Sequence, residues 1–264
     1  MNSALLRERF AIPDHVSIQD IAPDYPVLDI RNPHATARIA VHGAQVLSFQ
    51  PEGEEDLLWV SKTAVFAEGT SVRGGIPICW PWFGRHPKKD MPSHGFARNR
   101  FWTLCAVEQQ DDGRTVVTLS LEDDAQSRAI WPHAFQLQLQ VSVGRSLSLA
   151  LTMRNKAAET VDLTMALHTY FSTGDIAQTA VRGLEGRVYI DALRDWRRFT
   201  QAGDVRGGLF YLGLSQCGQP TEGAALPPRV GAGTEGDGDD GGRAVSSRSR
   251  PADLRERAYR LGAG

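Results

Sequence analysis

The stretch "FQLQLQVSVGRSLSLALTM", residues 135 to 153, alternates apolar and polar side chains on both sides of a Gly-Arg turn. Phe135, Leu137 and Leu139 fall on one face of an extended strand, and the glutamines between them fall on the other. Leu147 and Leu149 repeat the pattern after the turn. Alternation of this length predicts two half-buried antiparallel strands.

The same period of two occurs in the flanking chain. It is present in "TVVTLSLE", residues 115 to 122, and in "VDLTMALHTYF", residues 161 to 171. Turn residues such as "DDGR", 111 to 114, separate the alternating runs. Short helices are expected only at residues 3 to 10 and 123 to 130. The sequence therefore predicts an all-β fold, a large antiparallel β-sandwich.

Charge, cysteine content and hydropathy restrict the class of protein. The 264-residue chain has 29 basic and 31 acidic side chains, a balance that argues against a general nucleic-acid or membrane-surface binder. Cys79, Cys105 and Cys217 form no CxxC pair, and the seven histidines show no HxH or HExxH spacing, so we expect no metal site. With no apolar run of signal or membrane-spanning length, we expect a cytoplasmic, soluble protein, monomeric by default.

The chain changes character near Arg206. Residues 207 to 264 hold 13 of the 26 glycines, and "GAGTEGDGDDGGRAVSSRSRP" has no hydrophobic period. We predict a folded domain over residues 1 to 206 and a flexible tail over residues 207 to 264. Two origins of the tail stay open: a natural disordered terminus, or a shifted reading frame in GC-rich DNA.

Three stretches do not follow the strand pattern and contain the candidate site. They are "VRGGIPICWPWFG" (72 to 84), "SHGFARNRFW" (93 to 102) and "ALHTYFSTGDI" (166 to 176). In the first, proline and glycine make a stiff, tightly turning loop around two tryptophans. Such a loop can form an aromatic wall against a sugar ring, or a hydrophobic plug at one end of the sandwich.

Charged and titratable side chains in these stretches suggest binding of an anion and proton transfer. Arg73 and Arg98, the latter close to His94, could hold a phosphate with bidentate hydrogen bonds, or each could pair with a carboxylate. His168 shares the polar face of its predicted strand with Asp162, away from the core. It could transfer protons near neutral pH, or be a surface histidine of no special role.

Taken together, "RGGIPICWPWFG", "HGFARN", "LHTYF" and "GLEGRVYIDAL" resemble the aldose 1-epimerase superfamily, most nearly the branch of glucose-6-phosphate 1-epimerases. The resemblance runs from about residue 37 to residue 196. It implies a galactose mutarotase-like supersandwich of antiparallel strands. It also implies that the protein interconverts the α and β anomers of a hexose 6-phosphate by acid–base ring opening, with no cofactor and no metal.

The resemblance assigns roles to four residues. His168 matches the catalytic histidine that donates a proton to the ring oxygen, and His94 matches a second active-site histidine that holds the sugar. Arg73 and Arg98 match positions that contact the substrate phosphate. The family often has glutamine where this chain has Ser93, so one hydrogen bond to the substrate is expected to be missing or altered.

The catalytic base has no match. In the family it is a glutamate late in the chain, preceded by an active-site aspartate, and both positions fall where the resemblance has ended. Asp191 matches a "YxD" position but is not assigned as the base. The other acidic residues considered, none of which can be matched, are Glu222, Glu235, Asp237, Asp239 and Asp240.

Three functions therefore stay open. The first is a hexose-6-phosphate mutarotase, its activity impaired by the unmatched base. The second is a non-catalytic sugar-phosphate binding protein, and the third is a purely structural β-sandwich. The preferred hexose phosphate is not specified by the sequence. Loss of the family's last strands is expected to leave a sheet edge uncovered and to lower solubility.

Overall fold

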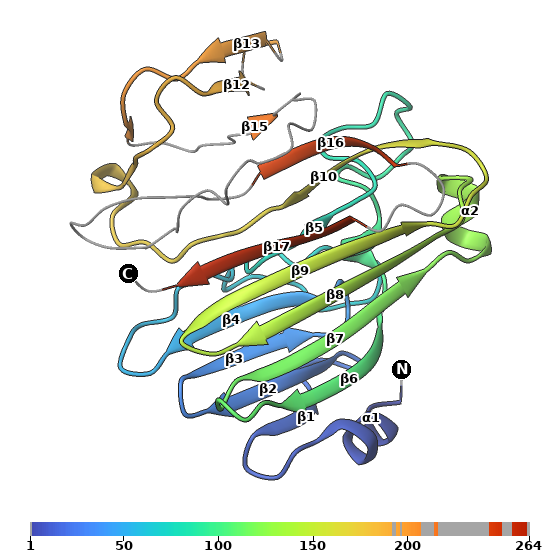
Figure 1. Ribbon diagram of the computed structural model, residues 1–264, viewed down its shortest axis with the longest axis vertical. Coiled ribbons are helices and arrows are strands. Elements are labelled where there is room, and N and C mark those ends of the chain that lie inside the picture. Colours follow the sequence, from blue (N-terminus) through green and yellow to red (C-terminus); the bar gives the residue numbers. More distant parts are fainter. Residues whose placement is uncertain are drawn as a thin grey trace.

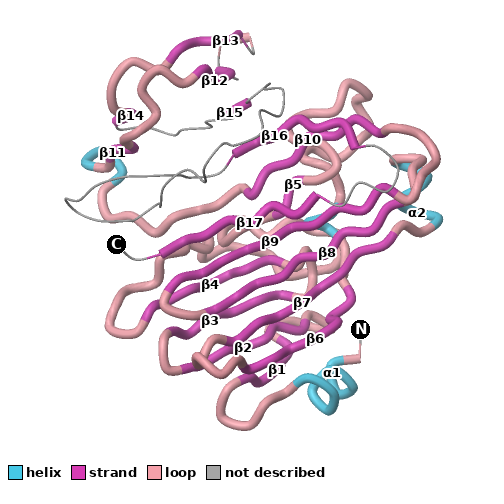
Figure 2. The backbone as a smooth tube through the Cα atoms, viewed as in Figure 1, coloured by secondary structure: helices cyan, strands magenta, loops and turns pink. Residues whose placement is uncertain are grey.

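The computed structural model describes residues 2–191, 194–195 and 197–206, and the backbone of three later strands at residues 214–215, 243–249 and 255–262. Strands are the main regular structure in this part of the chain, and helix is confined to short pieces (Figure 2). The two α-helices, α1 (Ser3–Phe10) and α2 (Ala125–Ile130), lie where the sequence predicts them. The all-β prediction is confirmed.

Two large antiparallel sheets form the body of the molecule (Figure 1). The first has the order β1-β2-β3-β4, and the second has the order β17-β9-β8-β7-β6. The strands of the first are β1 (Val16–Asp20), β2 (Pro26–Asn32), β3 (Ala35–Ala40) and β4 (Gln45–Pro51). Those of the second are β6 (Thr103–Gln109), β7 (Thr115–Glu122), β8 (Phe135–Val143), β9 (Ser146–Asn155) and β17 (Arg255–Gly262).

The β8–β9 hairpin is the pair predicted from the alternating stretch. Its register places Leu139 opposite Leu151 and Gln138 opposite Thr152. Leu139 is fully buried, whereas Gln138 is exposed. The alternation in the sequence therefore corresponds directly to the two faces of the sheet.

The core lies between the two large sheets. One continuous cluster of buried apolar side chains includes Ile39 and Phe49 from the first sheet and Val117 and Leu139 from the second. Because both sheets contribute to the same cluster, they pack face to face as a β-sandwich. The predicted architecture is thus confirmed.

Truncating a side chain at the centre of this core is expected to cost much stability. Leu139→Ala should lower the free energy of unfolding by about 2–5 kcal/mol, because it removes buried methyl groups and leaves a cavity. Its exposed neighbour provides the control: Gln138→Ala should change the value by no more than about 0.5 kcal/mol. Urea unfolding followed by tryptophan fluorescence measures both, and equal losses would contradict the assignment of Leu139 to the core.

A third sheet, with the order β15-β16-β10-β5, carries part of the candidate site. Its strands are β5 (Ile78–Cys79), β10 (Val161–Leu167), β15 (Leu214–Ser215) and β16 (Arg243–Ser249). Two further strand pairs follow β10 along the chain. They are β11 (Ala180–Val181) with β14 (Val205–Arg206), and β12 (Val188–Asp191) with β13 (Arg197–Thr200).

Three strands of the structure fall within the range predicted to be a tail. β16 pairs with β10, and β17 pairs with β9 along its length, so the edges of β9 and β10 are not left unpaired as expected from the sequence. Backbone pairing does not require an alternating hydrophobic pattern, so these strands have no local signal in the sequence. Residues 216–242, which include the five unmatched acidic residues of the tail, lie outside the described residues. The domain boundary at residue 206 stays a prediction.

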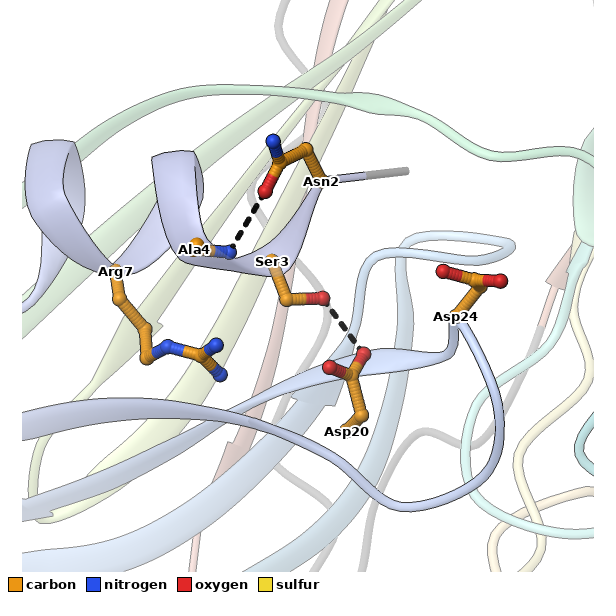
Figure 3. A pocket seen from close by; sticks show the side chains of 6 residues that line it. All are labelled: Asn2, Ser3, Ala4, Arg7, Asp20 and Asp24. Atoms are coloured by element: carbon orange, nitrogen blue, oxygen red, sulfur yellow. Dashed lines mark hydrogen bonds between the residues drawn. The ribbon is translucent and has the colours of Figure 1, made fainter.

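A shallow hollow beside α1 is explained by helix capping. It is lined by Asn2, Ser3, Ala4, Arg7, Asp20 and Asp24 (Figure 3). The Asn2 side chain accepts a hydrogen bond from the Ala4 backbone N–H, and the Ser3 hydroxyl donates to Asp20 at 2.6 Å. These polar groups complete the first turn of the helix, which lies well away from β5 and β10 (Figure 1).

Candidate active site

The three stretches singled out in the sequence come together beside β5 and β10. Strand β5 pairs with the end of β10, with Cys79 opposite Ala166. An isolated bridge joins Trp80 to Gly95, which brings the second stretch against the first. The His168 backbone N–H donates to the carbonyl oxygen of Pro77 at 2.9 Å. Segments far apart in sequence thus form one surface.

Glycine is required where these segments approach most closely. Gly95 has φ +70°, and a Cβ built there would lie 1.9 Å from the Trp80 carbonyl oxygen. The next residue, Phe96, donates its backbone N–H to that same oxygen at 2.9 Å. Only glycine permits this contact, which fixes the position of the preceding His94.

The aromatic loop serves both of the purposes that the sequence left open. Trp80 is fully buried, and its ring contacts Phe135 of β8, so it closes the end of the core. Phe83 is half-buried instead, with its ring centroid 5.0 Å from that of His94 and 6.3 Å from that of His168. One part of the loop is a plug, and the other part adjoins the histidines.

His94 has a defined tautomer. The Gly84 backbone N–H donates to its Nδ1 at 3.2 Å. A backbone N–H can only donate, so Nδ1 carries a lone pair, and the neutral ring has its proton on Nε2. His94 therefore presents a hydrogen-bond donor at the other edge of its ring.

His168 lies immediately after β10, next to the other histidine. Its imidazole is half-buried, with the ring centroid 6.0 Å from that of His94 and 4.9 Å from that of Tyr170. The alternation predicted that His168 lies outside the core, and the structure agrees. Ala166, on the same predicted face, is nevertheless buried, and it lies opposite Cys79 of β5.

Both imidazoles resist protonation. Burial, the positive charge of Arg98 and the nearby His168 together lower the pKa of His94 to about 4. Burial is the main cause of the lowered pKa of His168; its own backbone opposes this effect, and the charge of Arg98 adds a smaller lowering. Both rings are consequently neutral at pH 7.

The two arginines have no carboxylate partner in the described part of the chain, where nine ion pairs are found and neither residue takes part. Arg98 donates from Nη2 to the Ser93 carbonyl oxygen at 2.8 Å, and its Nε is buried without a hydrogen-bond partner. Arg73 is exposed, and its guanidinium carbon lies 5.8 Å from the centre of the Trp59 ring. Of the two alternatives raised by the sequence, carboxylate pairing is not observed among these residues.

Trp59 and Tyr170, which were not among the site residues expected from the sequence, complete this surface. The Trp59 ring is 6.0 Å from the Tyr170 ring, which in turn adjoins His168. Backbone hydrogen bonds hold them, since the Trp59 N–H donates to the Tyr170 carbonyl and the Gly75 N–H donates to the Trp59 carbonyl. A row of rings thus leads from Arg73 to the histidines. Its only signal in the sequence was the position of Tyr170 inside "LHTYF".

No group of His, Cys, Asp and Glu suited to a metal ion occurs among the described residues. Asp191, the acidic residue at the "YxD" position, lies 3.3 Å from the Arg194 guanidinium.

The helices in the described part of the chain are too short to span a membrane.

The lowered pKa values predict sensitivity to acid. The folded chain disfavours protonation of His94 and His168, so the unfolded chain binds more protons below the ordinary histidine pKa of 6.5. Their contribution is fully present above pH 6.5 and is lost as the pH falls toward 4. From pH 7 to 5.5 the free energy of unfolding should fall by roughly 1–2 kcal/mol, with allowance for partial exposure of the rings.

Urea unfolding at several pH values measures this dependence. His94→Gln should flatten the profile, because it removes the group with the lowest pKa in the site. A free energy of unfolding that stays constant from pH 7 to 5.5 would show that the imidazoles are as accessible to protons as in the unfolded chain.

The face-to-face antiparallel sheets have the fold of galactose mutarotase-like proteins. The chain belongs to the aldose 1-epimerase family, whose model matches residues 26–205. The resemblance noted in the sequence is confirmed.

Proteins of two bacteria have sequences similar to that of this chain. Proteins of Escherichia coli K12 and Salmonella typhimurium, both named "putative glucose-6-phosphate 1-epimerase", are 36% and 38% identical over alignments of 199 residues, and each match covers 72% of this chain. The chain spans only 65% of the length of each.

Solved structures agree in fold. A crystal structure described as a "putative mutarotase" from Salmonella typhimurium superposes with a TM-score of 0.68 at 35% identity, covering 75% of this chain and 65% of that one. A protein from Synechocystis shares the fold at 20% identity, with a TM-score of 0.59 over 75% of this chain and 69% of that one.

Proposed function

We propose that this protein is a hexose-6-phosphate mutarotase that interconverts the α and β anomers of glucose 6-phosphate. The observation that carries the proposal is the grouping of two neutral histidines, His94 and His168, beside Arg98, whose Nε has no partner. The names of the relatives support the same substrate class. We further propose that the protein works as a cytoplasmic monomer, and that residues 1 to 206 form the epimerase-like domain.

In this proposal the two ends of the substrate are held by different groups. Arg73 and Arg98 bind the phosphate, where guanidinium groups can make charge-assisted, bidentate hydrogen bonds. Phe83 provides an apolar surface for the sugar ring, and the His94 Nε2–H donates to a sugar oxygen. Neither contact requires a metal or a cofactor.

Ring opening needs one acid and one base. His168 donates a proton to the ring oxygen as the C1–O5 bond breaks, while a base removes the proton of the C1 hydroxyl. The open aldehyde rotates about C1–C2, and the ring closes with either face of the carbonyl attacked. During ring closure the acid and the base exchange roles. The family glutamate that would serve as this base has no match in the chain, so the base is not assigned to a residue.

The substrate itself prepares the acid. Burial is the main cause of the lowered His168 pKa, and the charge of Arg98 lowers it further. A phosphate dianion bound to Arg98 offsets that charge and raises the pKa of the imidazole toward neutrality, where a general acid is most effective. A phosphorylated sugar should therefore bind more tightly than the free sugar, and the bound sugar phosphate should also react faster.

A non-catalytic sugar-phosphate binding protein is the second candidate. It is favoured by one observation: the chain spans 65% of its relatives, and no residue within the matched range 26–205 is assigned as the base. The two candidates share the phosphate site and differ only in the turnover of the bound sugar.

Exchange between the anomeric protons of glucose 6-phosphate, measured by NMR at increasing protein concentration, tests the proposal. The exchange rate should rise in proportion to the protein, with free glucose as the comparison. Saturable binding without faster exchange would favour the binding protein, and absence of binding would favour a purely structural sandwich.

A further inference from the structure

A further histidine is fully buried and contacts the segments that carry the two arginines. His42, between β3 and β4, is 0% exposed, as is Tyr25 beside it. The His42 Nδ1 is 3.2 Å from the Tyr25 hydroxyl oxygen, and the Phe101 ring packs edge-on at a centroid distance of 5.0 Å. This buried imidazole has no part in the proposed chemistry, so its presence in an otherwise apolar pocket needs a reason.

The hydrogen bonds of His42 fix its tautomer and attach a loop. The Gly69 backbone N–H donates to Nε2 at 3.2 Å. The neutral ring therefore carries its proton on Nδ1 and donates it to the Tyr25 hydroxyl. Burial lowers the pKa of His42, opposed in part by the Asn99 backbone and the Glu68 carboxylate, so that the acceptor at Nε2 is retained at neutral pH.

The loop held by this hydrogen bond leads to the first arginine. Gly69 precedes Arg73 by four residues, and the Ser71 hydroxyl between them donates to the Asn99 side chain at 2.5 Å. Asn99 directly follows Arg98. The loop of Arg73 thus contacts the turn of Arg98 at one point, while His42 holds the same loop at another.

The backbone beside His42 contacts the second arginine. Gly43, at φ +72°, donates its N–H to the Arg100 carbonyl at 2.7 Å, and a Cβ built on it would lie 2.8 Å from the Arg98 carbonyl oxygen. His42 itself forms an isolated bridge with Phe101. One residue therefore joins the loop of Arg73, through its side chain, to the segment of Arg98, through its backbone.

We propose that His42 is a positioning residue that sets the spacing of Arg73 and Arg98 for a single phosphate group. The inference rests on the proposed function and adds a residue that touches neither substrate nor histidine pair. Since two guanidinium groups must meet one dianion together, a small shift of the Arg73 loop should weaken phosphate binding considerably.

A matched pair of amide variants tests the proposal. The Oε1 of His42→Gln can reach the position of Nε2 and accept from Gly69, whereas the shorter His42→Asn reaches only the position of Nδ1. The affinity of the full chain for inorganic phosphate, measured by calorimetry, should fall about tenfold or more in His42→Asn and stay within about threefold of wild type in His42→Gln. With glucose 6-phosphate, the His42→Asn change should appear in KM more than in kcat.

Leu139→Ala is the control for lost stability alone, and it should lower the unfolding midpoint without changing phosphate affinity. Equal phosphate affinity in the two amide variants overturns the proposal. If neither variant folds, Tyr25→Phe replaces them, because it removes only the hydroxyl that orients His42. An unchanged phosphate affinity in Tyr25→Phe would also overturn the proposed role of His42. Wild-type protein that binds no phosphate rejects the proposed function together with this inference, whereas equal affinities reject the inference alone.

Discussion

Replacing His168 with glutamine is expected to lower the protein-dependent rate of glucose 6-phosphate mutarotation by about 10²- to 10⁴-fold, the usual contribution of a positioned acid. Glutamine can donate a hydrogen bond from a similar position but cannot transfer a proton. Anomeric exchange measured by NMR gives the rate, and calorimetry gives the affinity. The dissociation constant of the sugar phosphate should stay within about threefold of wild type, because the arginines are intact.

His94→Gln is the matched control for this variant. The two rings lie 6.0 Å apart, so both substitutions change the same small region. If His94 only donates a hydrogen bond to the sugar, glutamine replaces that donor in part, and the rate should fall by tenfold or less. A larger loss in His94→Gln than in His168→Gln would assign the acid to His94 instead.

The sequence predicts the sandwich because strand periodicity is local information. In an extended strand, alternate side chains face opposite sides, so the run around Leu139 shows which face is buried without knowledge of its partner. The same reasoning placed His168 outside the core. The strands β16 and β17 were missed, since their pairing partners are distant and their segments show no such period.

The composition of the site could be predicted only in part. His94, His168 and Arg98 lie together as the motif resemblance implied, because short motifs of the family mark the segments that meet there. The contribution of Trp59 and Tyr170 could not be read from spacing, since more than a hundred residues separate them and only the folded chain joins them. His42 carries no sequence signal, because burial of one polar ring depends on its tertiary contacts.

Between the two alternatives for the arginines, the structure was needed to decide. An arginine in a loop pairs with a carboxylate more often than with a ligand, and spacing along the chain does not reveal which carboxylates lie near in space. The buried, unpartnered Nε of Arg98 is a three-dimensional fact. It leaves unfilled hydrogen-bonding capacity beside the two histidines.

Arg98→Met is expected to weaken binding of glucose 6-phosphate by about 10- to 100-fold, while binding of unphosphorylated glucose changes less than about threefold. Hydrogen bonds to a charged group contribute about 1.5–3 kcal/mol, and 1.4 kcal/mol corresponds to a factor of ten. Methionine keeps most of the apolar volume of the side chain and removes the charge. Calorimetric titration with both sugars measures the difference, and equal losses for both would show that Arg98 does not bind phosphate.

The same variant should also change the titration of the acid. Because the positive charge of Arg98 lowers the pKa of His168, its removal should raise that pKa, and saturating inorganic phosphate should raise it in the wild-type protein for the same reason. The imidazole proton signals in NMR report both shifts. Arg73→Met is the matched control: its guanidinium lies over Trp59, so it should weaken phosphate binding without the same direct effect on the imidazole. If phosphate shifts the His168 titration equally in wild type and in Arg98→Met, the effect of phosphate on the His168 pKa does not depend on Arg98. In that case the phosphate group contributes to binding of the sugar, and Arg98 does not link it to the acid.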